Sequence, residues 1–157
     1  MRPTKIRDRA EAVRWRATLS GRVAFTNGVF DLLHAGHVAF LEDARALGDV
    51  LIVGVNDDAS AARLGKGPGR PFVPLDDRMR VLSALAAVDC VVAFPEDTPA
   101  DLIGALEPDV LVKGSDYDPT HLPGRDAVLR RGGTVTVIPL LPGRSTTALV
   151  ERIRGTT

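Results

Sequence analysis

Five short apolar runs, separated by segments with helical spacing, constrain the fold of this 157-residue chain more than any other feature. Such runs are typical of strands that are buried on both faces. An alternation of strands and helices is typical of a parallel sheet with helices on both sides. We therefore predict an α/β protein with a Rossmann-like three-layer fold and a five-stranded parallel sheet. This pattern leaves the order of the strands open.

The expected elements alternate along the chain. Strands are predicted at residues 23–25, 50–55, 89–94, 109–113 and 134–138, and helices at 37–47, 75–87, 99–106, 124–131 and 146–154. A polar helix is expected at residues 6–19, so we divide the chain into an N-terminal helical extension, residues 1–20, and a main domain, residues 21–157. Residues 56–74 contain three glycines and three prolines and are predicted to form one long loop. A loop of that length in a compact domain is usually functional.

Charge and cysteine content narrow the class of function. Lysine plus arginine number 20, as do aspartate plus glutamate, and this formal neutrality argues against broad nucleic-acid binding, which needs a basic surface. Cys90 is the single cysteine, so an internal disulfide is excluded. The first twenty residues lack an apolar signal-peptide core, and no run approaches the ~18 apolar residues that span a membrane. We expect a cytoplasmic protein with no nucleic-acid partner and no membrane partner.

The turn after the first predicted strand carries two histidines. Residues 26–37 read TNGVFDLLHAGH, which places His34 and His37 where a helix begins. That end of a helix attracts anions, and Gly36 lets the backbone approach a phosphate closely. Imidazoles there can donate hydrogen bonds to phosphate oxygens. Two incidental histidines or a metal pair would show the same spacing. A metal pair is disfavoured because no third ligand apart from Asp31 is nearby. The context of a strand, an Asn-Gly turn and a helix favours phosphate, so we predict phosphate binding and no metal site.

Three more segments follow predicted strands, and ligands of open parallel sheets bind at that edge. Residues 66–71 place Lys66 and Arg70 on a Gly/Pro scaffold, residues 113–117 read KGSDY, and residues 143–147 read GRSTT. Hydroxyls in the last segment can cap a helix or hold a phosphate. Taken alone, the first segment is more typical of a solvated turn, the second is equally typical of a polar strand-end loop, and the third is more typical of a plain helix cap. Their coincidence at one edge favours a phosphate site. The phosphate motifs GxGxxG and GxxxxGK[ST] are absent.

With these segments the sequence resembles the HxGH nucleotidyltransferase, or cytidylyltransferase-like, superfamily, and it is most similar to the heptose 1-phosphate adenylyltransferases. The resemblance spans nearly the whole chain after residue 20. The matching segments are TNGVFDLLHAGH (26–37), LGDVLIVGVNDDAS (47–60), KGPGRP (66–71), EDTPADLI (96–103), PDVLVKGSDY (108–117) and RSTT (144–147). Val29 and Ser115 replace the cysteine and glycine that are usual in the family, and Gly65 is an extra residue. These departures leave the sugar, its anomer and the base open.

The resemblance implies an enzyme, with a nucleotidyltransferase domain at residues 21–157. It would transfer AMP from ATP to a sugar 1-phosphate, with D-glycero-D-manno-heptose 1-phosphate as the expected acceptor, giving ADP-heptose and pyrophosphate. ATP is then a substrate, Mg²⁺ is expected to assist, a separate sugar kinase would supply the acceptor, and a homodimer is expected. The alternatives are a related transferase acting on glycerol 3-phosphate, phosphoethanolamine or FMN, and a non-catalytic nucleotide-binding module. A class I aminoacyl-tRNA synthetase is disfavoured by the short chain and its neutral charge.

The resemblance also assigns roles to residues. His34 and His37 match positions that contact the ATP phosphates, and we expect catalytic roles for both and for Lys66. The residues expected to bind the nucleotide are Thr26, Asn27, Gly28, Phe30, Gly36, Lys113, Gly114, Asp116, Arg144, Ser145 and Thr146. Those expected to bind the acceptor substrate are Asp31, Lys66 and Arg70.

Overall fold

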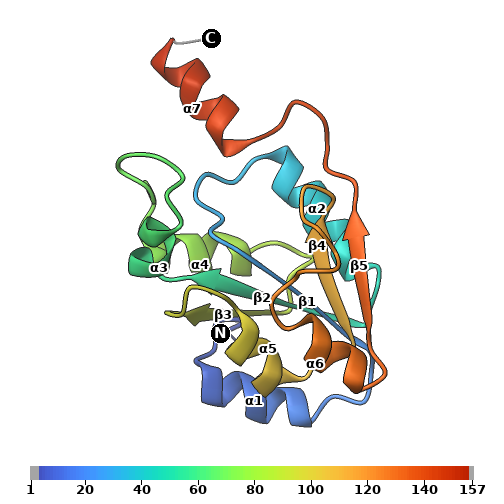
Figure 1. Cartoon of the computed structure of the whole chain (residues 1–157). Helices are drawn as coiled ribbons and strands as arrows, with labels where there is room; N and C mark the ends of the chain where they lie inside the picture. The colour runs from blue at the N-terminus through green and yellow to red at the C-terminus, as the bar shows by residue number, and fades with distance from the viewer. Residues whose placement is uncertain (1–3, 156–157) are drawn as a thin grey trace.

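A five-stranded parallel sheet forms the centre of the computed structural model, which describes residues 4–155 (Figure 1). The strands are β1 (Val23–Gly28), β2 (Val50–Asn56), β3 (Cys90–Phe94), β4 (Val110–Gly114) and β5 (Thr134–Ile138). Their order in the sheet is β3-β2-β1-β4-β5, and all four pairings are parallel. The predicted fold class is confirmed. The chain builds outward from β1 in both directions, so the switch point, where ligands of such sheets bind, lies between β1 and β4.

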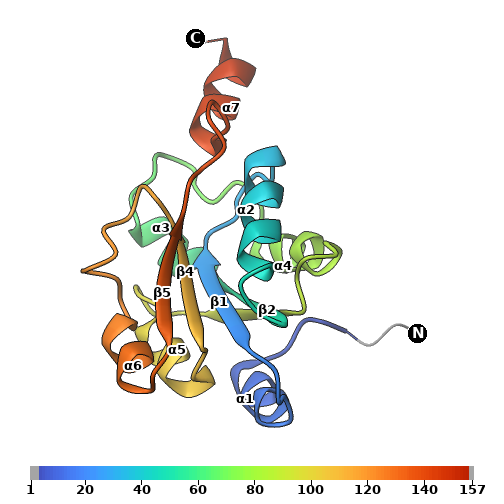
Figure 2. The same ribbon diagram turned by 90° about the vertical axis from the view of Figure 1, so that its right-hand side faces the viewer.

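Helices cover both faces of the sheet. They are α1 (Arg9–Ala17), α2 (Ala35–Arg45), α3 (Asp58–Arg63), α4 (Leu75–Ser83), α5 (Ala100–Leu106), α6 (Arg125–Arg130) and α7 (Thr146–Arg154). Helices α2 and α4 pack on one face, and α1, α5 and α6 pack on the other (Figure 2). Helix α7 projects from the layered body (Figures 1 and 2).

Two apolar clusters, one on each side of the sheet, form the core. Successive strand residues point to opposite faces, so Ala24 joins Leu41 of α2 in one cluster while its neighbours Val23 and Phe25 join Leu102 of α5 in the other. All five of these residues are fully buried. Because both faces are covered, the strands read as continuous apolar runs, and that is why the sequence could locate them.

The predicted single loop at residues 56–74 is wrong, because α3 lies within it. Asp57 caps this helix, since its carboxylate accepts a hydrogen bond of 2.8 Å from the Ser60 amide, and Ala61 within the helix is buried. The helix is only six residues long, so it shows no full period of apolar residues. Helix α4 also ends at Ser83 rather than at the predicted residue 87.

The chain before α1 pairs with the edge of the sheet. The Arg7 amide donates to the Val91 carbonyl at 3.0 Å, and the Val91 amide donates to the Lys5 carbonyl at 2.9 Å. Asp8 then begins α1, which buries Ala12 in the core beside α5. Within residues 4–155, no helix combines the length and apolar character that crossing a membrane would require.

Candidate active site

A cleft of about 480 Å³ opens at the carboxyl edge of the sheet, over the switch point between β1 and β4. Four segments far apart in the sequence line it: the turn from β1 into α2, the loop after α3, the end of β4, and the chain from Leu140 to Thr147. The structure therefore brings together every predicted site residue except Thr26. The Thr26 side chain is fully buried in β1, outside the cleft lining, and its hydroxyl has no hydrogen-bond partner among the described residues.

The two histidines form a capping box at the start of α2. Nδ1 of His34 accepts a hydrogen bond from the Gly36 amide at 3.1 Å, and Nδ1 of His37 accepts one from the His34 amide at 3.3 Å. The ring centroids are 3.9 Å apart. Because Nδ1 is an acceptor in each ring, the proton of each neutral imidazole sits on Nε2. Each ring can therefore donate one hydrogen bond to a ligand.

Burial favours the neutral form of both rings. It lowers the pKa of His37 to about 4, and repulsion from His34, when that ring is protonated, and from Lys66 acts in the same direction. Burial also lowers the pKa of His34. The site thus presents two neutral N–H donors at the positive end of a helix, an arrangement that suits phosphate oxygens.

Close packing explains the glycine between the histidines. A Cβ on Gly36 would lie 2.9 Å from Nδ1 of His34 and 3.0 Å from Cβ of Arg144. Any larger residue would push the His34 ring or the chain at Arg144 out of the cleft. The preceding turn includes Phe30, which adopts a left-handed φ of 53°. For a residue other than glycine this conformation is sparsely populated and is often associated with functional sites.

Lys113 is the penultimate residue of β4, at the switch point. Its side chain is buried, Nζ donates to the Asn27 carbonyl at 2.9 Å, and the ammonium lies 4.2 Å from the centre of the Tyr117 ring. Burial lowers the pKa of Lys113 to about 8, with the charge of Lys66 adding to the shift and that of Asp116 opposing it. An anionic ligand in the cleft would raise this pKa again, because it favours the charged form of the lysine.

The last part of the cleft comes from the exposed segment that leads into α7. Oγ of Ser145 caps the helix by accepting from the Ala148 amide at 3.0 Å. Oγ1 of Thr146 donates to the Leu32 carbonyl at 3.3 Å, which ties the segment to the histidine turn. Arg144 is exposed at the cleft wall.

Comparison with known proteins identifies the family to which the chain belongs. The family model described as "Cytidylyltransferase-like" matches residues 25–151, a stretch that includes all four segments of the cleft. The chain belongs to the cytidylyltransferase-like family. The predicted family is therefore confirmed, and with it the nucleotidyltransferase class of this domain.

Relatives of the cytidylyltransferase-like domain carry the name bifunctional protein HldE. The chain is 60% identical to the HldE of Alkalilimnicola ehrlichii over 134 residues, which is 85% of the chain and 28% of that protein. It is 58% identical to the HldE of Halorhodospira halophila over 144 residues, which is 92% of the chain and 30% of that protein. The chain thus spans less than a third of the length of these relatives.

Solved structures agree with the fold. A lipopolysaccharide core biosynthesis protein from Thermoplasma volcanium GSS1 aligns with a TM-score of 0.65 at 27% identity, covering 78% of this chain and 98% of that one. A pantoate-beta-alanine ligase from Francisella tularensis aligns with a TM-score of 0.58 at 16% identity, covering 92% of this chain and 69% of that one. At that identity the second match indicates the fold alone.

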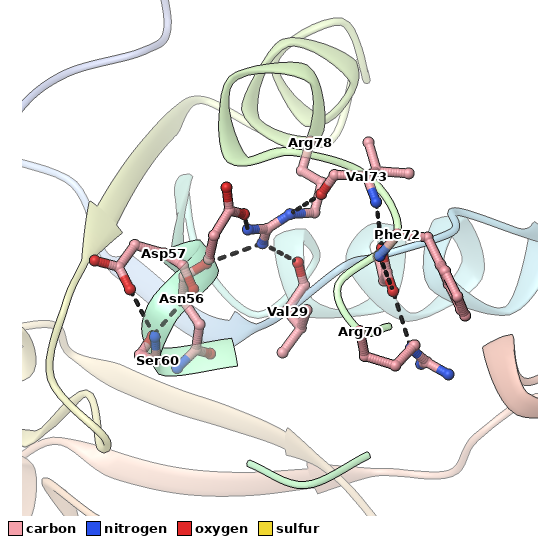
Figure 3. Close-up of polar contacts among 10 residues, drawn as sticks. Val29, Asn56, Asp57, Ser60, Arg70, Phe72, Val73 and Arg78 are labelled. Carbon is pink, nitrogen blue, oxygen red and sulfur yellow. Dashed lines mark hydrogen bonds and ion pairs between the residues drawn. The ribbon is translucent and has the colours of Figure 1, made fainter. Parts of the chain in front are cut away.

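In the cytidylyltransferase-like domain, Asp31 and Arg70 bind each other. Oδ2 of Asp31 accepts from Nε of Arg70 at 2.9 Å, and Oδ1 accepts from the amides of Phe72 and Val73, each at 2.9 Å (Figure 3). Both were predicted to bind the acceptor. Asp31 is buried and occupied with these contacts, so the structure gives it a role in holding the loop, while Arg70 still lines the cleft.

Sequence reasoning missed Arg78. Its fully buried guanidinium donates to the carbonyls of Val73 at 2.9 Å, Val29 at 2.7 Å and Asn56 at 2.9 Å, and it pairs with Oδ1 of Asp58 at 2.7 Å (Figure 3). One side chain therefore joins the turn after β1, the end of β2, the start of α3 and the loop between α3 and α4. The sequence did hold one indication that Arg78 is buried. It lies on the same side of α4 as the buried apolar residues Met79 and Leu82.

Proposed function

We propose that this domain transfers AMP from ATP to D-glycero-D-manno-heptose 1-phosphate, giving ADP-heptose and pyrophosphate. The observation that carries the proposal is the convergence in one cleft of two neutral imidazole donors, two lysines and a capped helix start. These groups suit two phosphate-bearing substrates that must meet at one point. The similarity to the HldE proteins favours a heptose phosphate as the acceptor.

The reaction needs no covalent intermediate on the protein. An oxygen of the acceptor phosphate attacks the α-phosphorus of ATP in line, and the bond from that phosphorus to pyrophosphate breaks. His34 and His37 donate hydrogen bonds from Nε2 to the phosphate oxygens, where negative charge is concentrated. Lys66 and Lys113 offset the repulsion between the two phosphates. Catalysis is then positioning and charge stabilisation.

The leaving pyrophosphate is assigned to the segment that begins α7. Its hydroxyls and free amides lie at the positive end of that helix, and Arg144 can bind a phosphate with two parallel hydrogen bonds. This assignment gives the two ends of the triphosphate different partners in the cleft.

Magnesium fits this cleft as an ion that arrives with the triphosphate. Residues 4–155 contain no cluster of three or more His, Cys, Asp or Glu side chains placed to hold a metal. Mg²⁺ usually keeps several waters and binds one or two carboxylates plus substrate phosphates. Asp116 lines the cleft and makes no hydrogen bond or ion pair with another described residue, so it would hold the ion. The ion would neutralise charge on the triphosphate.

The physiological setting completes the proposal. A kinase activity must supply the sugar 1-phosphate, and the relatives' description as bifunctional is compatible with a second activity elsewhere in those longer chains. A homodimer and a cytoplasmic location remain predictions from the sequence and the family resemblance.

Pyrophosphate release across a panel of substrates tests the function. ATP and CTP are each combined with heptose 1-phosphate, glycerol 3-phosphate, phosphoethanolamine and FMN. We expect release with ATP and heptose 1-phosphate, and its loss in His34→Ala, which controls for contaminating enzymes. Turnover of FMN or glycerol 3-phosphate with no turnover of the heptose phosphate would contradict the proposal.

A further inference from the structure

A second, smaller cavity adjoins the cleft. Its volume is about 140 Å³, and it shares a wall with the cleft that includes Lys66 and Lys113. The rest of its lining comes from the end of β2, the residue after α3, the middle of β4, the chain after β3 and the chain before α6. The two cavities therefore meet at the two lysines.

Size separates the ligands that the two cavities can take. At about 30 Å³ per water, the smaller cavity has room for about five waters, enough for one small ring. A nucleoside triphosphate needs the larger cleft of about 480 Å³, which also holds the histidines and the start of α7. The smaller cavity is therefore left for part of the other substrate.

The smaller cavity is lined by a side-chain amide that is free to bind a ligand. Asn56, which is only 3% exposed, lines it, and its backbone carbonyl accepts from Arg78 at 2.9 Å. Its side-chain amide points away from Arg78 (Figure 3) and makes no hydrogen bond with any other described residue. Polar groups in such sites normally find partners, so this amide is available to hydrogen bond a polar group that occupies the cavity.

The other walls favour a sugar. They are mostly apolar, from Leu64, Leu111 and Leu122, with polar side chains at the rim from Asp97 and Thr98. A sugar ring offers an apolar C–H face to such walls and hydroxyls to the polar groups. Few and well-placed polar groups in an apolar pocket are typical of small-molecule sites.

We infer that the smaller cavity is the subsite for the sugar ring of the acceptor, and that the Asn56 amide selects the acceptor by hydrogen bonding one of its hydroxyls. The ring lies in the smaller cavity, and its phosphate lies between Lys66 and Lys113, facing the α-phosphate of ATP. This inference rests on the proposed function, because it takes a sugar phosphate as the acceptor. An acceptor without the matching hydroxyl would leave the buried amide unpaired and would be rejected.

Binding, measured without turnover, tests the subsite. Heptose 1-phosphate is titrated calorimetrically into the protein in the presence of α,β-methylene-ATP, which cannot release pyrophosphate. The variant Asn56→Leu keeps the branched shape and the number of side-chain heavy atoms but removes the hydrogen bonds. The variant Leu64→Trp fills the cavity from a residue that is 43% exposed, so the core is not disturbed. Leu129→Trp is the matched control, since Leu129 is 39% exposed and lines neither cavity.

We expect Asn56→Leu to weaken heptose 1-phosphate binding at least tenfold and Leu64→Trp to abolish it. Both variants should bind α,β-methylene-ATP within about twofold of the wild type, which also shows that they are folded. If the wild type binds heptose 1-phosphate and both variants bind it equally well, the subsite is wrong while the proposed function survives. If the wild type binds glycerol 3-phosphate or FMN and not the heptose phosphate, the proposed function fails and the sugar assignment fails with it.

Discussion

The histidine turn and the segment from Leu140 to Arg154 both bring phosphate-binding groups to the cleft, but they are held in opposite ways. The histidine turn is fixed by its capping box, by the carbonyl that Val29 offers to Arg78, and by the buried ring of Phe30. In contrast, α7, whose residues all belong to the described chain, has no buried residue. The difference separates two tasks, since the reacting phosphorus needs fixed partners, whereas a leaving group must be released.

Among the variants, replacement of Arg78 should destabilise the histidine turn the most. In Arg78→Met, three carbonyls lose a charged donor, in two buried bonds and one partly buried bond, and each such bond is worth about 1.5–3 kcal/mol. We expect the free energy of unfolding, measured with urea, to fall by at least about 3 kcal/mol. Arg80→Met, at an exposed position of the same helix, is the control and should change stability by no more than about 0.5 kcal/mol. Similar small losses in both would mean that Arg78 does not hold the turn.

The histidines should matter for rate rather than for folding. We expect His34→Ala and His37→Ala each to lower kcat about 10²–10³-fold, the effect of losing one preorganised donor. Loss of the capping contacts should cost only about 0.5–2 kcal/mol of stability. His121→Ala is the control, because this third histidine is exposed and outside the cleft. A fully active double variant at the two cleft histidines would exclude their proposed role.

The loop after α3, which carries Lys66 and Arg70, should determine how tightly the acceptor binds. Lys66→Ala removes a charged donor worth about 1.5–3 kcal/mol, so we expect the KM for the sugar phosphate to rise about tenfold or more, well above any change in the KM for ATP. Arg70→Ala should act similarly and also lower stability, because buried Asp31 loses its ion-pair partner. Steady-state kinetics with each substrate varied in turn measures both effects, and Arg130→Ala, outside the cleft, is the control. Equal effects on the two substrates would assign the loop to neither one alone.

Acid should destabilise the histidine turn through the half-buried ring of His37. The pKa of His37 is about 4 in the folded chain, below the ordinary value of 6.5. The unfolded chain therefore binds more protons between these values, and stability falls as the pH drops from 6.5 towards 4. One such group contributes at most about 1.4 kcal/mol per pH unit. Urea unfolding across this range should give a shallower slope for His37→Gln than for the wild type, and identical slopes would contradict the neutral, half-buried ring.

Substitutions at the start of α7 should have the smallest effect on stability. Ser145→Ala with Thr146→Ala removes a cap worth about 0.5–2 kcal/mol, and because α7 buries no described residue, little of this loss should reach the core. We expect a higher KM for ATP and an almost unchanged melting temperature. Ser145→Asp keeps a side-chain cap but adds a negative charge, so it should raise the KM for ATP without destabilising α7. A lower melting temperature with unchanged kinetics would mean that the two hydroxyls only cap the helix.

The sequence predicted the parts of this molecule that depend on local pattern. The strands were located because both faces of the sheet are covered, and the cleft was located because ligands bind at the carboxyl ends of parallel strands. The strand order, the contacts of Arg78 and the unpaired amide of Asn56 depend on residues that are distant in the sequence, so no local pattern indicates them. Thr26 shows the same dependence, because a residue within a matching motif can have its side chain buried in a strand, outside the cleft lining.

The short pairing of residues 5–7 with Val91 has a consequence for how copies of this molecule avoid one another. Strand β3 lies at one margin of the sheet, and an open margin offers unpaired amides and carbonyls to any similar strand. Here the Lys5 carbonyl and the Arg7 amide already occupy the Val91 positions on that margin. The same few residues that lead into α1 thus protect this edge against edge-to-edge aggregation. Their removal should first reduce solubility at high protein concentration, before it alters ligand binding at the distant cleft.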